Sequence, residues 1–304
     1  NPDGDCIGAM LALSRALKLR FGTTATLFSH DGVPLFLRFM LAPGEKIHDS
    51  SDIEAMRAKT FDSAILVDTA TKKRAGEAFF PFMDNAGATL CIDHHVTNGH
   101  FAAHNFVDGD ASSTCEVLFH FFRACGWEIT PDIAGCLYLG IMYDTGRFMH
   151  TNTTPEVFSV CGELVDAGAD PSNIAGHVYK DRPMSSLRLL GHALNNMKTS
   201  ADGHIAWATV PRTVFGELGA TDADTEGIVE ALGAFHGCEV HVFFCEGPDG
   251  LSRVSSRSAG RIKVGEICQM FGGGGHDFAA GIRTSKPLEE IERLFIEEAA
   301  KRLG

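Results

Sequence analysis

The 304-residue sequence lacks three features that mark common protein classes. No apolar run reaches the roughly 18 residues that a membrane-spanning helix needs, so we expect a soluble protein. The nine cysteines are odd in number and form no Cys-x-x-Cys pair, which favours a reducing cytoplasm over a secreted disulfide framework. Basic residues are few, with 26 Lys and Arg against 39 Asp and Glu and a net charge of −13. This balance argues against general attraction to long nucleic acid.

Short apolar runs alternate with helical patterns in the first part of the chain. The expected elements are a helix over 7–19, strands over 25–28, 63–67 and 88–92, and helices over 114–125 and 133–143. This alternation predicts an α/β fold with a parallel sheet. Ligands of such sheets bind beyond the carboxyl ends of the strands.

A change of pattern near residues 180–200 predicts a second domain. Apolar residues at helical spacing are followed there by segments in which apolar and polar residues alternate, as in half-buried strands, and by a final helix over 288–303. We therefore expect a parallel-sheet domain over 1–182, a linker helix over 183–201 and a smaller α/β domain over 202–304.

Acidic and histidine side chains recur where a ligand of the parallel sheet would bind. The segments are, in chain order, Asn1-Pro2-Asp3-Gly4-Asp5, Asp68 after Val67, Asp93-His94-His95 after Ile92, and Asp144-Thr145-Gly146 after Tyr143. A turn, a helix cap or a surface loop explains each segment at least as well when it is taken alone. Their joint occurrence points to a shared metal site.

The residue types of these segments indicate the chemistry. Carboxylates suit hard cations, and imidazoles tilt the preference toward Mn²⁺ over Mg²⁺ or Ca²⁺. Two ions about 3.5–4 Å apart, bridged by one carboxylate, can neutralise a phosphate and supply hydroxide near neutral pH. Bound cations also reverse the local sign of an acidic site, so a small phosphorylated substrate is compatible with the net charge. The pattern predicts hydrolysis of phosphate esters.

Three further features are candidates for phosphate binding. Four consecutive glycines, Gly272 to Gly275, precede His276 and can present N–H groups to a ligand, although a flexible loop is the alternative. Arg257 lies among serines and can grip a phosphate with its planar fork, or be an ordinary strand-end arginine. Ser113, at a helix start, is better explained as a cap than as a phosphate ligand.

These motifs resemble those of the DHH phosphoesterase superfamily. Asn1–Asp5, Val67-Asp68, Asp93–His95 and Gly140–Gly146 are similar to its four motifs, in the same order. Arg257 and the segment 272–281 resemble its C-terminal domain, DHHA1. Length and domain content are most similar to the NrnA type, oligoribonucleases that also dephosphorylate 3′-phosphoadenosine 5′-phosphate (pAp).

The resemblance implies a role for each matched residue of the first domain. The implied ligands are Asp3 and Asp68 for one metal, and Asp5, Asp68, His94 and Asp144 for the other. Asp68 would bridge the two ions, which would be Mn²⁺ with Mg²⁺ as the alternative, and His95 would lie by the scissile phosphate. In the family, a histidine four residues before the position of Asp3 also binds the first metal, and that position falls before Asn1.

The resemblance also implies the substrate. The nucleotide or its terminal phosphate would be held in a cleft between the domains, by Arg257, Gly273, Gly274, Gly275 and His276. Asp277 stands where the family often has a basic residue. The implied reactions are hydrolysis of short RNA to mononucleotides and of pAp to AMP. The alternatives are a cyclic or linear dinucleotide phosphodiesterase (c-di-AMP, pGpG) and a catalytically silent nucleotide-binding protein. A homodimer remains open.

Overall fold

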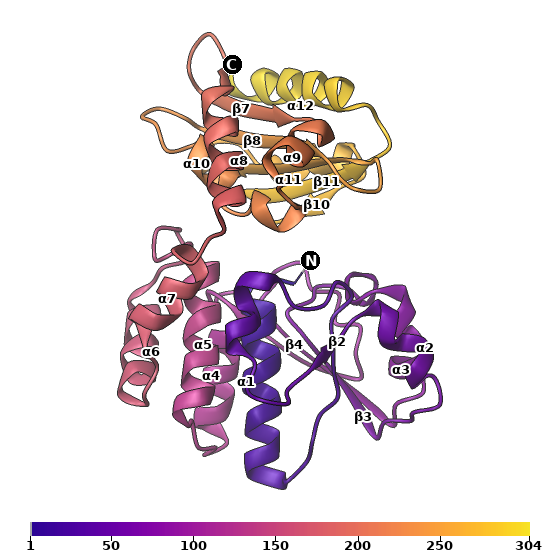
Figure 1. Ribbon diagram of the computed structural model, residues 1–304. Coiled ribbons are helices and arrows are strands. Elements are labelled where there is room, and N and C mark those ends of the chain that lie inside the picture. The colour runs from indigo at the N-terminus through magenta and orange to yellow at the C-terminus, as the bar shows by residue number, and fades with distance from the viewer. Residues whose placement is uncertain (1) are drawn as a thin grey trace. The chain divides into compact units, whose positions relative to one another are not determined.

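The computed structural model describes residues 2–304, so Asn1 of the expected N-terminal motif lies outside the described residues. The α/β class is confirmed, and the chain divides into two compact units at Asp181–Arg182 (Figure 1). The segment 183–201, expected as a linker helix, contributes helix α8 (Met184–Asn195) and strand β6 (Lys198–Thr199) to the second unit. Within residues 2–304, no helix combines the length and the apolar character that crossing a membrane requires.

The first unit contains a three-stranded parallel sheet in the order β3 (Ser63–Val67), β4 (Ala88–Asp93) and β5 (His104–Val107). The parallel register pairs Val67 with Ile92, so the residues that follow both strands leave the sheet at the same edge. The strand expected over 25–28 is shorter than predicted. It is β1 (Leu27–Phe28), which pairs in parallel with β2 (Ile47–His48) apart from the main sheet.

The remaining elements of this unit are helical. The α-helices are α1 (Gly4–Phe21), α2 (Ile53–Met56), α3 (Phe80–Asp84), α4 (Thr114–Ala124), α5 (Pro131–Asp144), α6 (Pro155–Asp166) and α7 (Pro171–Tyr179). The 3₁₀ segments are η1 (Leu35–Met40), η2 (Ser50–Asp52), η3 (Lys72–Ala75) and η4 (Glu77–Phe79). The expected helices over 7–19, 114–125 and 133–143 correspond to α1, α4 and α5.

Helices α1, α4 and α5 pack side by side (Figure 1). Helix α1 also contacts β3, and α4 contacts β4. Helix α5 is apolar on nearly every side because α1, α4, α6 and α7 surround it. Glycines allow the close approach of α1 and α5. A Cβ atom on Gly8 would lie 2.5 Å from the Cys136 carbonyl oxygen. This approach matters for function because α1 and α5 both provide site residues.

The second unit is a six-stranded sheet covered on both faces. Its order is β10 (Gly274–Gly275), β11 (Ala279–Thr284), β9 (Ser252–Ser258), β8 (Val240–Glu246), β7 (Ile205–Val210) and β6. Within this sheet β7 and β8 are parallel, and the other neighbouring strands are antiparallel. The covering helices are α8, α9 (Arg212–Leu218), α10 (Ile228–Leu232), α11 (Val264–Met270) and α12 (Leu288–Leu303), with the 3₁₀ segment η5 (Asp222–Thr225).

The alternation along β8 shows how this sheet is buried. Val242 and Phe244 belong to the core formed with α11 and α12, whereas Phe243 and Cys245 belong to the core formed with α8, α9 and α10. Successive side chains of a strand point to opposite faces, so each face of β8 reaches one of the two cores. The expected C-terminal helix over 288–303 is confirmed as α12.

Candidate metal centre

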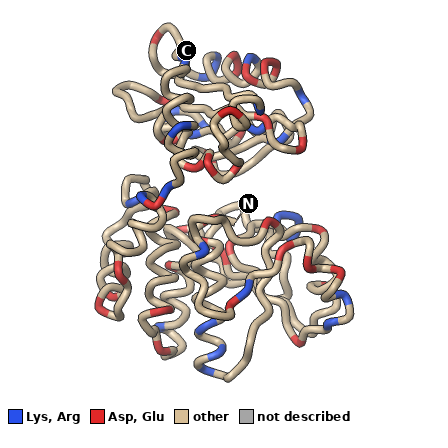
Figure 2. Tube along the Cα trace, viewed as in Figure 1, with Lys and Arg blue, Asp and Glu red and all other residues tan. Residues whose placement is uncertain are grey.

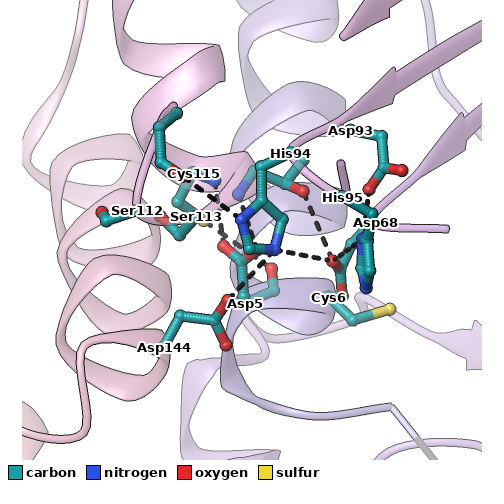
Figure 3. Close-up of polar contacts among 12 residues, drawn as sticks. Asp5, Cys6, Asp68, Asp93, His94, His95, Ser112, Ser113, Cys115 and Asp144 are labelled. Carbon is teal, nitrogen blue, oxygen red and sulfur yellow. Dashed lines mark hydrogen bonds and ion pairs between the residues drawn. The ribbon is translucent and has the colours of Figure 1, made fainter. Parts of the chain in front are cut away.

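Asp68 leaves strand β3 in an unusual backbone conformation. Its φ is 52°, in the left-handed region that Asp tolerates better than most residues. The Asp68 N–H donates to the Ile92 carbonyl at 3.0 Å, which continues the β3–β4 hydrogen bonding by one residue. The chain therefore turns directly after the sheet, and the carboxylate lies beside the histidines that follow β4 (Figure 3).

Asp3 and Asp5 lie at the start of helix α1 but have different environments. Asp3 is the N-cap, and its Oδ1 accepts the N–H groups of Asp5 and Cys6, both at 3.0 Å. Asp5 is fully buried, and its carboxylate accepts the N–H groups of Thr114 at 2.7 Å and Cys115 at 2.9 Å. Those groups open helix α4, where unpaired N–H groups and the helix dipole favour an anion.

The anion position at the start of α4 is therefore filled by Asp5. Ser113, considered above as a phosphate ligand, is fully buried, and its Oγ accepts the Glu116 N–H at 3.1 Å. This is the capping role that the sequence favoured. We leave Ser113 out of the proposed substrate site.

Asp144 is the last residue of helix α5. It therefore differs from Asp68 and His94, which follow strands. Its Oδ2 lies 3.1 Å from Nε2 of His94. The next turn is tight, since Gly146, Arg147 and Phe148 all have positive φ values between 56° and 64°. Non-glycine residues in this region cost of order 1–3 kcal/mol each, so packing around the turn must hold them.

Two side chains in and after this turn, Arg147 and Asn152, contact other residues of the first unit. The Arg147 guanidinium stacks over the ring of Tyr179 at 4.4 Å. Asn152 donates to the Asp144 carbonyl oxygen at 3.2 Å and to the Ser112 carbonyl oxygen at 3.0 Å. Asn152 thus ties the end of α5 to the segment before α4, and Arg147 is not directed at the carboxylates.

His94 lies at the centre of the cluster (Figure 3). Its Nε2 is 3.1 Å from Asp144, 3.7 Å from Asp68 and 4.0 Å from Asp5, and its side chain is 8% exposed. One group of mutually close ligand atoms, all within 4.8 Å, consists of Asp5, Asp68 and His94. A second consists of Asp68, Asp93 and His95. Asp68 belongs to both groups, so its carboxylate lies between His94 and His95.

Asp93 has a different role from the other aspartates. Its Oδ1 accepts from Nδ1 of His95 at 2.7 Å, and its Oδ2 accepts from Asn98 at 2.6 Å. Burial alone would raise the pKa of Asp93, but these two hydrogen bonds outweigh it and hold the pKa below its usual value. Asp93 is therefore a carboxylate that orients His95, with both oxygens already engaged.

The remaining carboxylates repel one another. Burial first, and then the charges of the neighbouring aspartates, raise the pKa of Asp68 well above its usual range, and the same causes raise that of Asp3. Burial is also the largest cause that raises the pKa of Asp144 to about 7. Burial alone would lower the pKa of His94, but its contact with Asp144 and the nearby charges raise it to about 9.

This donor set fits a divalent metal. Carboxylate oxygens suit Mn²⁺ and Mg²⁺, and the imidazole of His94 tilts the preference toward Mn²⁺. A cation among the carboxylates would stabilise their ionised forms. Asp3 belongs to neither of the two close ligand groups described above, although Asp5 and His94 act electrostatically on it. The structure thus brings Asp5, Asp68, His94 and Asp144 together most closely, with Asp3 beside them.

In the second unit, the sheet register brings two of the predicted phosphate-binding features together. Arg257 of β9 pairs with Ala279 of β11, whose carbonyl oxygen accepts the His276 N–H at 2.9 Å. The Arg257 guanidinium forms an ion pair with Glu230 of α10 at 3.0 Å. Arg257 is one-third exposed, so a phosphate could compete with Glu230 for it.

The glycines next to His276 have a packing role. A Cβ atom on Gly275 would lie 2.6 Å from the Ala279 carbonyl oxygen, and the φ of Gly275 is 144°. The N–H groups of Gly272 and Gly273 donate to carbonyl groups at the end of α11. Glycine is thus required at position 275 for the tight β10–β11 hairpin, whereas a Cβ atom on Gly274 would meet nothing within 4 Å. The N–H groups of Gly272 and Gly273 are not available for phosphate. Asp277 pairs with Lys263 at 2.8 Å, so a basic side chain does lie beside this segment.

Comparison with known proteins decides the family. Residues 1–141 match the N-terminal domain model of the DHH family, and residues 202–303 match the DHHA1 domain model. A Thermus thermophilus protein named bifunctional oligoribonuclease and PAP phosphatase NrnA is 33% identical over 95% of this chain and 83% of its own length. The chain belongs to the DHH family. It is a hydrolase of phosphoester bonds in a metal-dependent family.

Other DHH relatives agree over most of the chain. A Bacillus subtilis protein, also named bifunctional oligoribonuclease and PAP phosphatase NrnA, is 28% identical over 79% of this chain and 75% of its own length. The crystal structure of an exopolyphosphatase-related protein from Bacteroides fragilis has a TM-score of 0.89 at 27% identity. That comparison covers 99% of this chain and 89% of the other.

Several residues of this DHH site were not identified from the sequence. Thr114 and Cys115 anchor Asp5 through backbone groups, which any residue type provides and no sequence pattern reveals. Asn98 supports Asp93 from a loop. Arg74 lies 3.3 Å from Nε2 of His95. Arg74 is six residues after Asp68, in the same segment that leaves strand β3. That short separation was the one feature of the sequence that could have placed Arg74 near the site.

Proposed function

We propose that this protein is a two-metal phosphoesterase that hydrolyses short oligoribonucleotides to mononucleotides and pAp to AMP. The observation on which the chemistry rests is the buried cluster in which Asp5, Asp68 and Asp144 surround His94. The names of the Thermus and Bacillus relatives support the choice of substrates. The net charge of −13 suits a short substrate better than a long one.

In this proposal, Asp3 and Asp68 hold one ion, and Asp5, Asp68, His94 and Asp144 hold the other. The ions are Mn²⁺, with Mg²⁺ as the alternative, because the donors are carboxylates with one imidazole. Bound at these residues, they would neutralise the substrate phosphate and supply hydroxide near neutral pH. The chain's part is to hold these ligands in place, which the backbone contacts of Asp5 and the turn after Asp68 do.

We assign His95 to proton handling at the scissile bond. Its contact with the Asp93 carboxylate assigns the Nδ1 proton, so Nε2 is the nitrogen that can accept or return a proton. A positioned imidazole of this kind typically contributes 10²–10⁴-fold to a rate. Asp93 and Asn98 hold the ring in one orientation, because both Asp93 oxygens are engaged.

The second unit supplies substrate-binding groups in this proposal. Arg257 would exchange its contact with Glu230 for a substrate phosphate. His276 lies in the connection between β10 and β11, and its N–H donates to Ala279, the residue that pairs with Arg257. Acidic and basic residues are interspersed along both units (Figure 2). Affinity would therefore come from individual cations such as Arg257. We also propose that the protein works in the cytoplasm, where its nine cysteines would stay reduced.

The test is hydrolysis by the Mn²⁺-loaded protein of RNAs of two to five nucleotides, pAp, pGpG and c-di-AMP. We expect mononucleotides from the RNAs and AMP from pAp, with both activities abolished in His94→Ala and Asp68→Ala. His104→Ala is the matched control, because His104 is exposed on β5 of the same unit. Unchanged rates in His94→Ala would contradict the site. Hydrolysis of c-di-AMP or pGpG alone would favour the dinucleotide alternative, and a protein that binds no metal would rule out the mechanism.

A further inference from the structure

Arg74 lies beside the histidine that we assign to proton handling. It belongs to η3, in the segment that follows Asp68, and its Nη1 is 3.3 Å from Nε2 of His95. The other ring nitrogen, Nδ1, is 2.7 Å from the buried carboxylate of Asp93. A carboxylate only accepts, so Nδ1 donates to Asp93 and Nε2 faces the Arg74 guanidinium. Arg74 therefore lies on the Nε2 side of His95, the side that we assign to proton handling.

The charge of Arg74 is not neutralised within residues 2–304. No carboxylate of these residues forms an ion pair with Arg74, and its side chain is exposed. Its neighbour Lys72 differs, since Lys72 contacts Asp84 and lies over the ring of Phe80. A guanidinium has five N–H donors, so one contact with His95 leaves several available. Beside a cluster of aspartates, a cation that pairs with none of them is suited to an incoming anion.

We propose that Arg74 binds the phosphate group that is hydrolysed, through a non-bridging oxygen on the His95 side of the site. This inference rests on the proposed function, because it names a substrate contact of the same site. The planar fork of arginine matches two oxygens of a phosphate. The contact would place the phosphorus next to Nε2 of His95. One segment of chain would then provide both Asp68 for the metals and Arg74 for the substrate.

The test compares Arg74→Ala and Arg74→Lys with Lys73→Ala, which removes a positive charge from the adjacent residue of the same 3₁₀ turn. Each variant is loaded with Mn²⁺ and checked for unchanged metal content. Two quantities are then measured: kcat and KM for pAp, and the calorimetric Kd of inorganic phosphate. For Arg74→Ala we expect phosphate binding and kcat/KM to fall about 10- to 100-fold, the effect of losing a charged hydrogen bond. Arg74→Lys should recover part of the lost phosphate affinity and kcat/KM. For Lys73→Ala both quantities should stay within about twofold of the wild type.

Two results would overturn the inference. If Arg74→Ala binds inorganic phosphate as tightly as the wild type while kcat falls, Arg74 only positions His95. If Lys73→Ala and Arg74→Ala lose affinity equally, the effect is general attraction by a basic segment. Failure of the proposed function would look different, because the wild type itself would then cleave neither RNA nor pAp. The phosphate titration would still decide whether Arg74 binds phosphate.

Discussion

Substituting Gly8 by alanine tests the packing that brings α1 and α5 together at the site. The added Cβ would lie 2.5 Å from the Cys136 carbonyl oxygen and 3.2 Å from Sγ of Cys115. The first contact is with helix backbone and cannot be relieved by a side-chain rotation, so the two helices must separate. Asp5 is three residues before Gly8 on α1, and it would move with the helix.

The expected size follows from two opposing effects. Replacing glycine by alanine inside a helix stabilises it by about 1 kcal/mol. Forcing an extra methyl group into a packed core costs about 1–3 kcal/mol, and a rigid backbone contact places Gly8→Ala at the upper end. The net loss is then about 2 kcal/mol, which lowers the Tm by about 4–8 °C for a unit of this size. Because metal ligands tolerate displacements of only about 0.5 Å, we expect Mn²⁺ affinity to fall about tenfold.

Gly162→Ala is the matched control. Gly162 lies within α6 of the same unit, and a Cβ atom there would meet nothing within 4 Å. Its Tm should rise by about 2–4 °C, because only the helix-propensity gain remains. The measurements are thermal unfolding followed by circular dichroism and calorimetric titration with Mn²⁺. Equal behaviour of Gly8→Ala and Gly162→Ala in both assays would refute the reasoning.

Two further predictions concern the site itself. Asp93→Asn should lower kcat about 100-fold or more with unchanged metal content, because His95 loses the charge that holds its ring. An unchanged kcat would contradict the role of Asp93 in orienting His95. In metal-free protein, Tm should fall as pH rises from about 5 to 9. The folded state keeps protons on Asp144 (pKa about 7) and His94 (about 9) that the unfolded state releases near 3.8 and 6.5. The Tm gain on adding Mn²⁺ should grow over the same range, and a flat or rising metal-free profile would contradict the electrostatic account.

The sequence alone predicted the elements whose pattern is local. Strands β3 and β4 and helix α12 were predicted because continuous apolar runs and helical periodicity depend only on neighbouring residues. Asp68 and His94 were identified for a related reason. Residues that follow buried parallel strands lie at one edge of the sheet, so their proximity follows from the fold class.

The contacts that determine what each side chain does were decided by the tertiary structure. Asp5 is held by the N–H groups of Thr114 and Cys115, which are 109 and 110 residues away in the chain. Its carboxylate therefore occupies the start of α4, where Ser113 was a candidate phosphate ligand. Asp93 was grouped with the metal-binding run, yet its oxygens are engaged by His95 and Asn98. No local sequence pattern indicated a function for Arg74. Hydrogen-bond partners, burial and charge depend on distances between segments far apart in the chain, and folding alone sets those distances.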